Sequence, residues 1–149
     1  MRKVVLLTGM IVLIGLAENA AYACSCVEVN TAKKGTAAKT NYKRWLKGVR
    51  GAVFTGRVTK IETDPSYQQS KVTFEVERYW KGVQGSEVVI MTAAYTSACG
   101  VPYTLGETYF VVADGSVGKL STDLCSHLGY SKYKAAFIKG MGKGHAAQH

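Results

Sequence analysis

The junction between an apolar leader and a pair of cysteines constrains this chain more than any other part of its sequence. An apolar run extends from Val4 to Ala17 behind two basic residues, and Ala21 and Ala23 stand just before Cys24. A basic start, an apolar centre and small residues at the end are typical of a secretory signal peptide. We therefore expect residues 1–23 to be removed on export, which leaves Cys24 as the first residue of a secreted or periplasmic protein.

Two other interpretations of the leader give the N-terminus a different chemistry. An uncleaved membrane anchor is disfavoured because the apolar run has about 14 residues, whereas a spanning helix needs roughly 20. Lipoprotein processing would attach lipid to Cys24 and block its amine, but Tyr22 is bulky where that pathway prefers a small or β-branched residue. Cleavage before Cys24 therefore predicts a free α-amino group there and no membrane span in the mature chain.

Length and charge set limits on the mature chain. Removing 23 of the 149 residues leaves 126, the size of one domain. The leader takes two bases and one acid with it, so the mature charge is 17 minus 9, or +8. This charge suits polyanionic surfaces, although it also keeps an exported protein soluble. No nucleic-acid-binding motif is present, and export argues against nucleic acid as a partner.

Four cysteines delivered to an oxidising compartment are expected to form two disulfide bonds. Three pairings are possible. Cys24 with Cys26 is the least favourable, because two residues so spaced in an extended segment lie too far apart for an unstrained bridge. Both remaining pairings join the mature N-terminus to Cys99 and Cys125. The N-terminal segment is therefore predicted to be held at two points by the body of the chain.

Alternating apolar residues predict that the body of the chain is β structure. In the clearest case Val72, Phe74 and Val76 point to one face of a strand and charged residues to the other. Gly56, within another apolar segment, suggests a β-bulge or a sharp coil of the strand. Five strands are expected, at Ala52 to Glu62, Lys71 to Trp80, Glu87 to Ala94, Thr108 to Ala113 and Val117 to Thr122, with a turn at Asp114-Gly115. Strands of this number and length favour a small closed barrel or a sandwich.

Two helices are predicted beside the strands. The segment Thr36 to Val49 places Tyr42, Trp45 and Leu46 on one helical face and its basic residues elsewhere. A second helix is expected at Ser131 to Lys139, and the ending Gly140 to His149 is expected to be frayed. The predicted organisation is a signal peptide at 1–23, one domain at 24–130, and a C-terminal helix with a flexible basic tail at 131–149.

The cysteines and their neighbours, taken together, resemble a known family. The motifs are, in order, Cys24-Ser25-Cys26-Val27, Trp80-Lys81-Gly82 at the end of a strand, Ser97-Ala98-Cys99-Gly100-Val101, and Leu124-Cys125. These motifs and their order resemble the N-terminal, netrin-like domain of the tissue inhibitors of metalloproteinases, over nearly the whole mature chain up to about Tyr130. The resemblance implies a mainly β fold, a five-stranded OB-fold-like closed barrel with one or two flanking helices and two disulfides.

The resemblance also implies a disulfide pattern and a binding surface. It pairs Cys24 with Cys99 and Cys26 with Cys125. The N-terminal segment and the connector before Cys99 would then form one ridge that enters the cleft of a zinc metalloprotease. The residues implied to contact the protease are Cys24, Ser25, Cys26, Val27, Ser97 and Ala98.

Zinc chemistry explains why the first mature residue would matter. A catalytic zinc has three protein ligands and a fourth position for water. The neutral α-amine of Cys24 would take that position, and its carbonyl oxygen would close a five-membered chelate ring. Ser25 would point into the specificity pocket beside the metal, while Cys26 and Val27 would follow along the primed side. The zinc would belong to the protease, so the chain itself is expected to need no cofactor.

Two functions of different classes follow from these observations. The first is a secreted inhibitor of zinc metalloproteases that acts through Cys24. The alternative is a secreted netrin-like module that binds polyanions or a protein partner and inhibits nothing. An enzyme is not expected, because no spacing of Ser, His and Asp is typical of a hydrolase. Animal inhibitors carry three disulfides in this domain and a further cysteine-rich domain, so the four cysteines here resemble single-domain bacterial members instead.

Overall fold

The computed structural model describes residue 24, residues 36–126 and residues 138–148. Its elements are, in chain order, α2 (Thr36–Gly48), β1 (Ala52–Asp64), β2 (Gln69–Lys81), β3 (Glu87–Ala93), η2 (Thr96–Ala98), β4 (Thr108–Ser116), β5 (Lys119–Ser121) and β6 (His145–Ala146). Residues 138–141 form a further helical turn. The predicted signal peptide, Ser25, Cys26, Val27 and most of the predicted helix at 131–139 lie outside the described residues.

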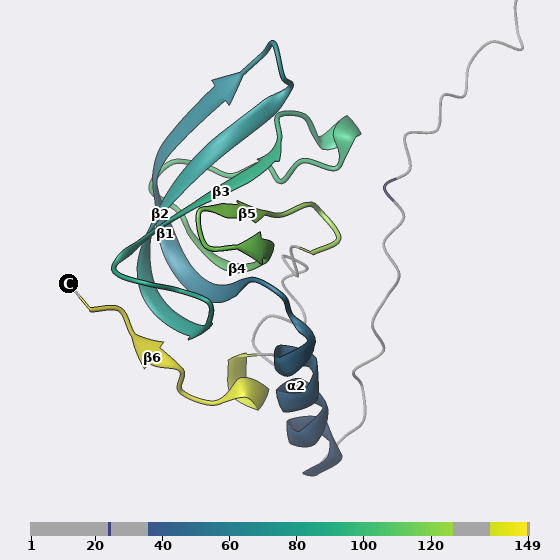
Figure 1. Ribbon diagram of the computed structural model, residues 1–149, viewed down its shortest axis with the longest axis vertical. Helices are drawn as coiled ribbons and strands as arrows, with labels where there is room; N and C mark the ends of the chain where they lie inside the picture. Colours follow the sequence, from purple (N-terminus) through teal and green to yellow (C-terminus); the bar gives the residue numbers. More distant parts are fainter. Residues whose placement is uncertain (1–23, 25–35, 127–137, 149) are drawn as a thin grey trace, which may run out of the picture.

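Five strands close into a barrel, with β1 and β2 forming a long hairpin that extends beyond it (Figure 1). The order around the barrel is β1–β4–β5–β3–β2, and β2 pairs with β1 again to close it. The pairing of β3 with β5 is parallel, and the other neighbouring strands are antiparallel. The predicted mainly β, five-stranded OB-like barrel is therefore confirmed, and β6 adds a short strand to the edge of β2.

The alternation along β2 produces the interior of the barrel. Val72, Phe74 and Val76 are buried, as the sequence predicted. The rings of Phe54 and Phe74 meet edge to face with their centroids 5.5 Å apart. The register between β1 and β2 shifts at Gly56, where an added Cβ would lie only 2.8 Å from the carbonyl oxygen of Glu75. The predicted bulge is confirmed, and glycine is required because the strands approach too closely there for a side chain.

The outer faces of β1 and β4 carry a second, smaller core beneath α2. Val53, Phe110 and Val112 alternate with the interior residues of the same strands and are buried together with Val49. The side chains packed against them come from α2, the end of β2 and the C-terminal segment, and are Trp45, Leu46, Trp80, Ile138 and Met141. Residues 52–54 of β1 and 110–113 of β4 are therefore buried on both faces, because the barrel interior covers one face and α2 with the C-terminal segment covers the other.

The end of the chain differs from its prediction. Instead of fraying from Gly140 onward, residues 138–148 lie beside α2 and β2 (Figure 1). The indole N–H of Trp80 donates to the carbonyl oxygen of Gly142 over 2.9 Å, and the Arg78 guanidinium donates to that of Lys143. His145 and Ala146 then pair with β2. These partners lie more than sixty positions away along the chain, so local composition does not reveal them.

The turn between β4 and β5 lies later than predicted. The sequence suggested a turn at Asp114-Gly115, but β4 continues to Ser116 and the two turn residues are Val117 and Gly118. Gly118 has φ of 82°, a left-handed conformation that favours glycine. The Asp-Gly sequence is a common turn signal, but here both of its residues pair with β5.

Candidate functional site

The candidate site is a ridge made by the connector between β3 and β4. After Ala93 the chain forms η2, in which the amides of Ala98 and Cys99 donate to the carbonyl oxygens of Tyr95 and Thr96 over 3.0 Å each. The side chains of Tyr95, Thr96, Ser97 and Ala98 are all exposed. Ser97 and Ala98, both predicted to contact a protease, therefore stand on an exposed loop with an ordered backbone.

The Cys99-Gly100 sequence is needed where the ridge turns back toward the barrel. Cys99 has φ of 64° and ψ of 19°, a left-handed conformation that costs a non-glycine residue about 1–3 kcal/mol. At Gly100 an added Cβ would lie 2.0 Å from the carbonyl oxygen of Ala93, so no side chain fits. Beyond the turn, the amide of Val101 donates to the hydroxyl of the buried Thr92 over 3.0 Å. These contacts fix the direction in which the Cys99 side chain leaves the ridge.

The Cys99 sulfur forms a disulfide with Cys24. The two Cα atoms are 5.8 Å apart, within the ordinary range for a disulfide, and 75 positions separate the residues along the chain. The predicted pairing of Cys24 with Cys99 is confirmed. Cys24 is half-buried, and its sulfur also lies 3.9 Å from the carbonyl oxygen of Thr96. A disulfide sulfur carries no proton to donate, so this approach is a packing contact, and it places Cys24 beside the exposed loop.

A second loop, at residues 123–126, is hydrogen-bonded to the ridge. The carboxylate of Asp123 accepts hydrogen bonds from the amides of Cys125 at 2.9 Å and Ser126 at 2.6 Å. The amide of Leu124 donates to the carbonyl oxygen of Cys99 over 2.9 Å, which joins the two loops directly. Cys125 is also disulfide-bonded. Its predicted partner, Cys26, lies outside the described residues, so that pairing stays a prediction.

The structure thus brings together three of the six predicted contact residues, Cys24, Ser97 and Ala98, at one end of the barrel. Sequence reasoning missed Asp123. Its signal was available, because an Asp two positions before Cys125 is typical of a turn in which the carboxylate accepts backbone N–H groups. Among residues 94–101 and 123–126, the titratable side chains are Tyr95 and Asp123. The described ridge therefore carries mainly neutral groups.

Comparisons with known proteins do not assign the chain. No protein-family model matches the sequence, and no curated protein matches it significantly. Within the part of the chain that the structure describes, no helix has the length and apolar character required to cross a membrane.

Proposed function

We propose that the chain, once cut after Ala23, inhibits zinc metalloproteases by binding the catalytic zinc through the α-amine and carbonyl oxygen of Cys24. The observation that carries this proposal is the Cys24–Cys99 disulfide, which fastens the first residue after the predicted cleavage site beside an exposed loop. The motifs that resemble the netrin-like domain of the tissue inhibitors of metalloproteinases point to the same function.

The chemistry needs a neutral amine at the right place. A free α-amino group has a pKa of about 7.7–8.0, so a substantial fraction is neutral near pH 7, and zinc binding displaces the remaining proton. The amine nitrogen replaces the zinc-bound water on which the protease depends for hydrolysis. Because the carbonyl oxygen of the same residue closes a five-membered ring with the metal, Cys24 supplies two ligand atoms without further ordering of the chain.

Pre-ordering favours tight binding. An inhibitor whose contact loop is already rigid loses little conformational entropy when it docks. Here the disulfide, the η2 hydrogen bonds and the link from Leu124 to Cys99 hold the ridge before any partner arrives. In the proposed complex Ser97 and Ala98 lie along the cleft beside Cys24. Ser25 enters the specificity pocket, and Cys26 and Val27 follow on the primed side.

The test compares two proteins that differ only at the N-terminus. One begins at Cys24, and the other carries one additional alanine before Cys24, which moves the α-amine away from the chelating position. Both are assayed at micromolar concentration against a panel of zinc endopeptidases, with a serine protease as a negative control. We expect inhibition by the first protein and a loss of about 100-fold or more in the second, because the zinc contact is removed.

Two readouts make the result decisive. Mass spectrometry of the exported protein reports whether Cys24 is the first residue and whether all four thiols are oxidised. Equal thermal unfolding of the two proteins shows that the added alanine leaves the fold intact. If the protein that begins at Cys24 leaves every zinc endopeptidase of the panel fully active, or if both proteins inhibit equally, chelation by Cys24 is wrong. A polyanion-binding module without inhibitory activity is then the better description.

A further inference from the structure

Charge is strongly segregated along this sequence. Residues 29–61 contain nine lysines and arginines and no acidic residue, and residues 124–149 contain four lysines and no acidic residue. Between them, residues 62–123 contain eight acidic residues and four basic ones. The net charge of the mature chain is therefore concentrated in two segments that are far apart in sequence.

The fold brings described parts of these two basic segments together. Ile138 and Met141 pack in the same small core as Trp45 and Leu46 of α2. Gly140 lies so close to Tyr42 that an added Cβ would be 1.9 Å from its ring. The C-terminal segment therefore lies beside α2 (Figure 1). Its lysines, Lys139 and Lys143, are exposed.

The outer face of α2 presents a row of cations. Lys43 and Lys47 are four positions apart in α2 and therefore share one side of the helix, and Arg50 follows two positions after its last residue, Gly48. Arg44 flanks this row, and all four side chains are exposed. The opposite side of α2 is buried, because Trp45 and Leu46 pack in the small core and Tyr42 lies against Gly140, and this fixes the orientation of the helix. We call Lys43, Arg44, Lys47 and Arg50 the α2 basic face.

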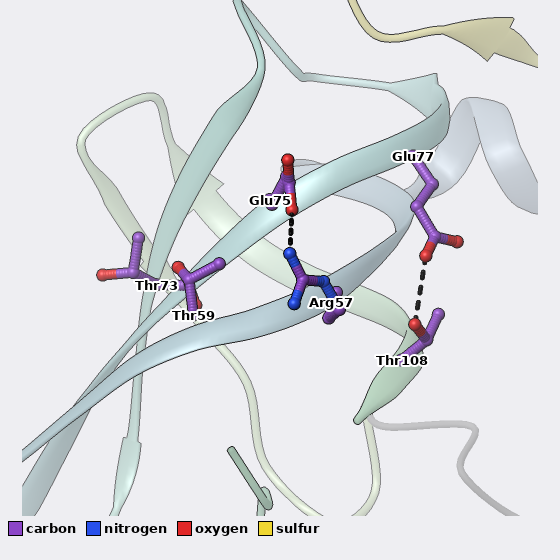
Figure 2. A network of polar contacts seen from close by, with 6 residues as sticks. All are labelled: Arg57, Thr59, Thr73, Glu75, Glu77 and Thr108. Carbon is purple, nitrogen blue, oxygen red and sulfur yellow. Dashed lines mark hydrogen bonds and ion pairs between the residues drawn. The ribbon is translucent and has the colours of Figure 1, made fainter. Parts of the chain in front are cut away.

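This basic face has no structural use in the described part of the chain. The ion pairs in the described part of the chain involve Arg57, Lys60 and Lys71, which belong to the β1–β2 hairpin and not to the basic face. Figure 2 shows Arg57 directed at Glu75. The carbonyl groups at the end of α2 are also satisfied without the basic face. The ammonium of Lys81 donates to those of Leu46, Lys47 and Val49.

An unneutralised row of like charges is unfavourable in the isolated protein. Lys43 and Lys47, one helical turn apart, repel each other. A bound polyanion removes this repulsion and releases its own counterions. In Figure 1 α2 lies below the barrel and the connector that follows β3 lies above β5, so a partner bound at α2 leaves the ridge free.

We propose that the α2 basic face binds a linear anionic polysaccharide. A bilayer is disfavoured because none of the large apolar side chains exposed in the described part of the chain belongs to α2 or to residues 138–148. Peripheral helices that enter a bilayer do so through an apolar face, and the apolar face of α2 is buried. Single-stranded nucleic acid needs exposed aromatic rings for base stacking, and the exposed tyrosines Tyr67 and Tyr95 lie elsewhere. A hydrated polyanion requires only the cations.

The test uses two triple variants with the same charge change. Lys43→Gln, Lys47→Gln and Arg50→Gln remove three cations from the basic face, while Lys60→Gln, Lys71→Gln and Lys119→Gln remove three from the hairpin and β5. Binding to heparin is measured by titration at fixed salt, with neutral dextran as the blank. We expect the first triple variant to bind about tenfold more weakly or worse, and the second to change by less than about threefold, since each exposed ionic contact contributes modestly.

Several outcomes would overturn the proposal. If both triple variants lose the same affinity, net charge alone drives binding and no located surface exists. If the first variant binds heparin like the wild type, the basic face is not the site. If vesicles containing phosphatidylglycerol or duplex DNA bind more tightly than heparin at the same salt, the partner class is wrong. The protein with an added N-terminal alanine must bind heparin unchanged, so a failure of protease inhibition does not affect this result.

Discussion

The two ends of the barrel are held by different forces. At the ridge, exposed loops are fixed by a disulfide, by backbone hydrogen bonds and by a left-handed turn at Cys99. At the α2 end, Phe110 and its apolar neighbours form a small core, and Lys81 satisfies the helix carbonyls. One end therefore depends on covalent and backbone geometry, and the other on apolar burial and a single cation.

Because the two ends are held by different interactions, we expect the two proposed activities to fail independently. Protease inhibition reports on the ridge, and heparin binding reports on the α2 basic face. A change that disturbs one end while the molecule stays folded should leave the other readout unaltered. Global stability supplies a third measurement, which separates local effects from unfolding.

The largest effect is expected when the disulfide between Cys24 and Cys99 is replaced by two serines. The bond closes a long loop, with 75 positions between the cysteines, and loss of such a bond from a small exported domain typically costs about 2–5 kcal/mol. Urea-induced unfolding measures this loss. Inhibition should also be abolished, although the double variant keeps an N-terminal amine, because the first residue of that variant is no longer fastened to the ridge.

Heparin binding provides the internal control for this double variant. Below its unfolding transition the variant should bind heparin with wild-type affinity, because the α2 end is held by its own core. Wild-type inhibition by the double variant would show that the disulfide does not position Cys24 for zinc. Loss of heparin binding by a folded double variant would contradict the independence of the two ends.

An intermediate effect is expected at the α2 end from Lys81→Met. The substitution retains most of the side-chain volume but removes the ammonium that donates to Leu46, Lys47 and Val49. Charged hydrogen bonds contribute about 1.5–3 kcal/mol, so the free energy of unfolding should fall by an amount in this range. Denaturant titration measures it. Lys119→Met is the matched control, since Lys119 is exposed on β5 and its substitution should stay within about 0.5 kcal/mol.

The ridge should respond less than the helix to Lys81→Met. Inhibition by the folded variant is expected to equal that of the wild type. If Lys81→Met is as stable as Lys119→Met, the cation does not hold the end of α2. The α2 end would then rest on apolar burial alone.

Sequence reasoning predicted the barrel well because its interior follows a local rule. The period-two alternation at Val72, Phe74 and Val76 places all three side chains inside, and Gly56 marks the bulge where two strands approach closely. The fold class could therefore be predicted from the strands, and the resemblance to netrin-like domains pointed to the same closed barrel. The turn predicted at Asp114-Gly115 was wrong, because both residues pair with β5 and this pairing overrides their turn preference.

Long-range contacts explain what local patterns could not predict. The docking of the C-terminal segment depends on Trp80 and Arg78, which lie more than sixty positions away from their partners. The pairing of Cys24 with Cys99 came from the resemblance, since spacing alone left alternatives open. The α2 basic face required the fold as well, because only the structure shows which cations lack carboxylate partners among the described residues.

The smallest effect is expected from Tyr103, beneath the ridge, and only at high pH. Its half-buried ring packs between Phe74 and Tyr109, with centroids 5.1 Å and 4.9 Å away. Burial raises the pKa of the Tyr103 hydroxyl well above its usual range, although the hydrogen bond with Thr122 opposes this shift. The folded state therefore resists ionisation of this group, whereas the unfolded chain ionises near pH 10.

The sign of the pH effect follows from this difference. Because the folded pKa lies above the unfolded one, the contribution of Tyr103 to stability is fully present below pH 10 and is lost as the pH rises further. Each pH unit above 10 should remove up to about 1.4 kcal/mol from the free energy of unfolding. Urea titrations from pH 9 to 11 measure the slope, with recovery at pH 9 to verify reversibility.

Phenylalanine substitution isolates the tyrosine that is responsible. Tyr103→Phe should flatten the slope above pH 10, because the variant has no hydroxyl that must stay protonated in the fold, and Thr122 keeps its hydrogen bond to Val112. Tyr67→Phe is the control, since Tyr67 is 77% exposed. An unchanged slope in Tyr103→Phe would place the alkaline sensitivity elsewhere. A flattened slope would show that the alkaline loss of stability arises from Tyr103.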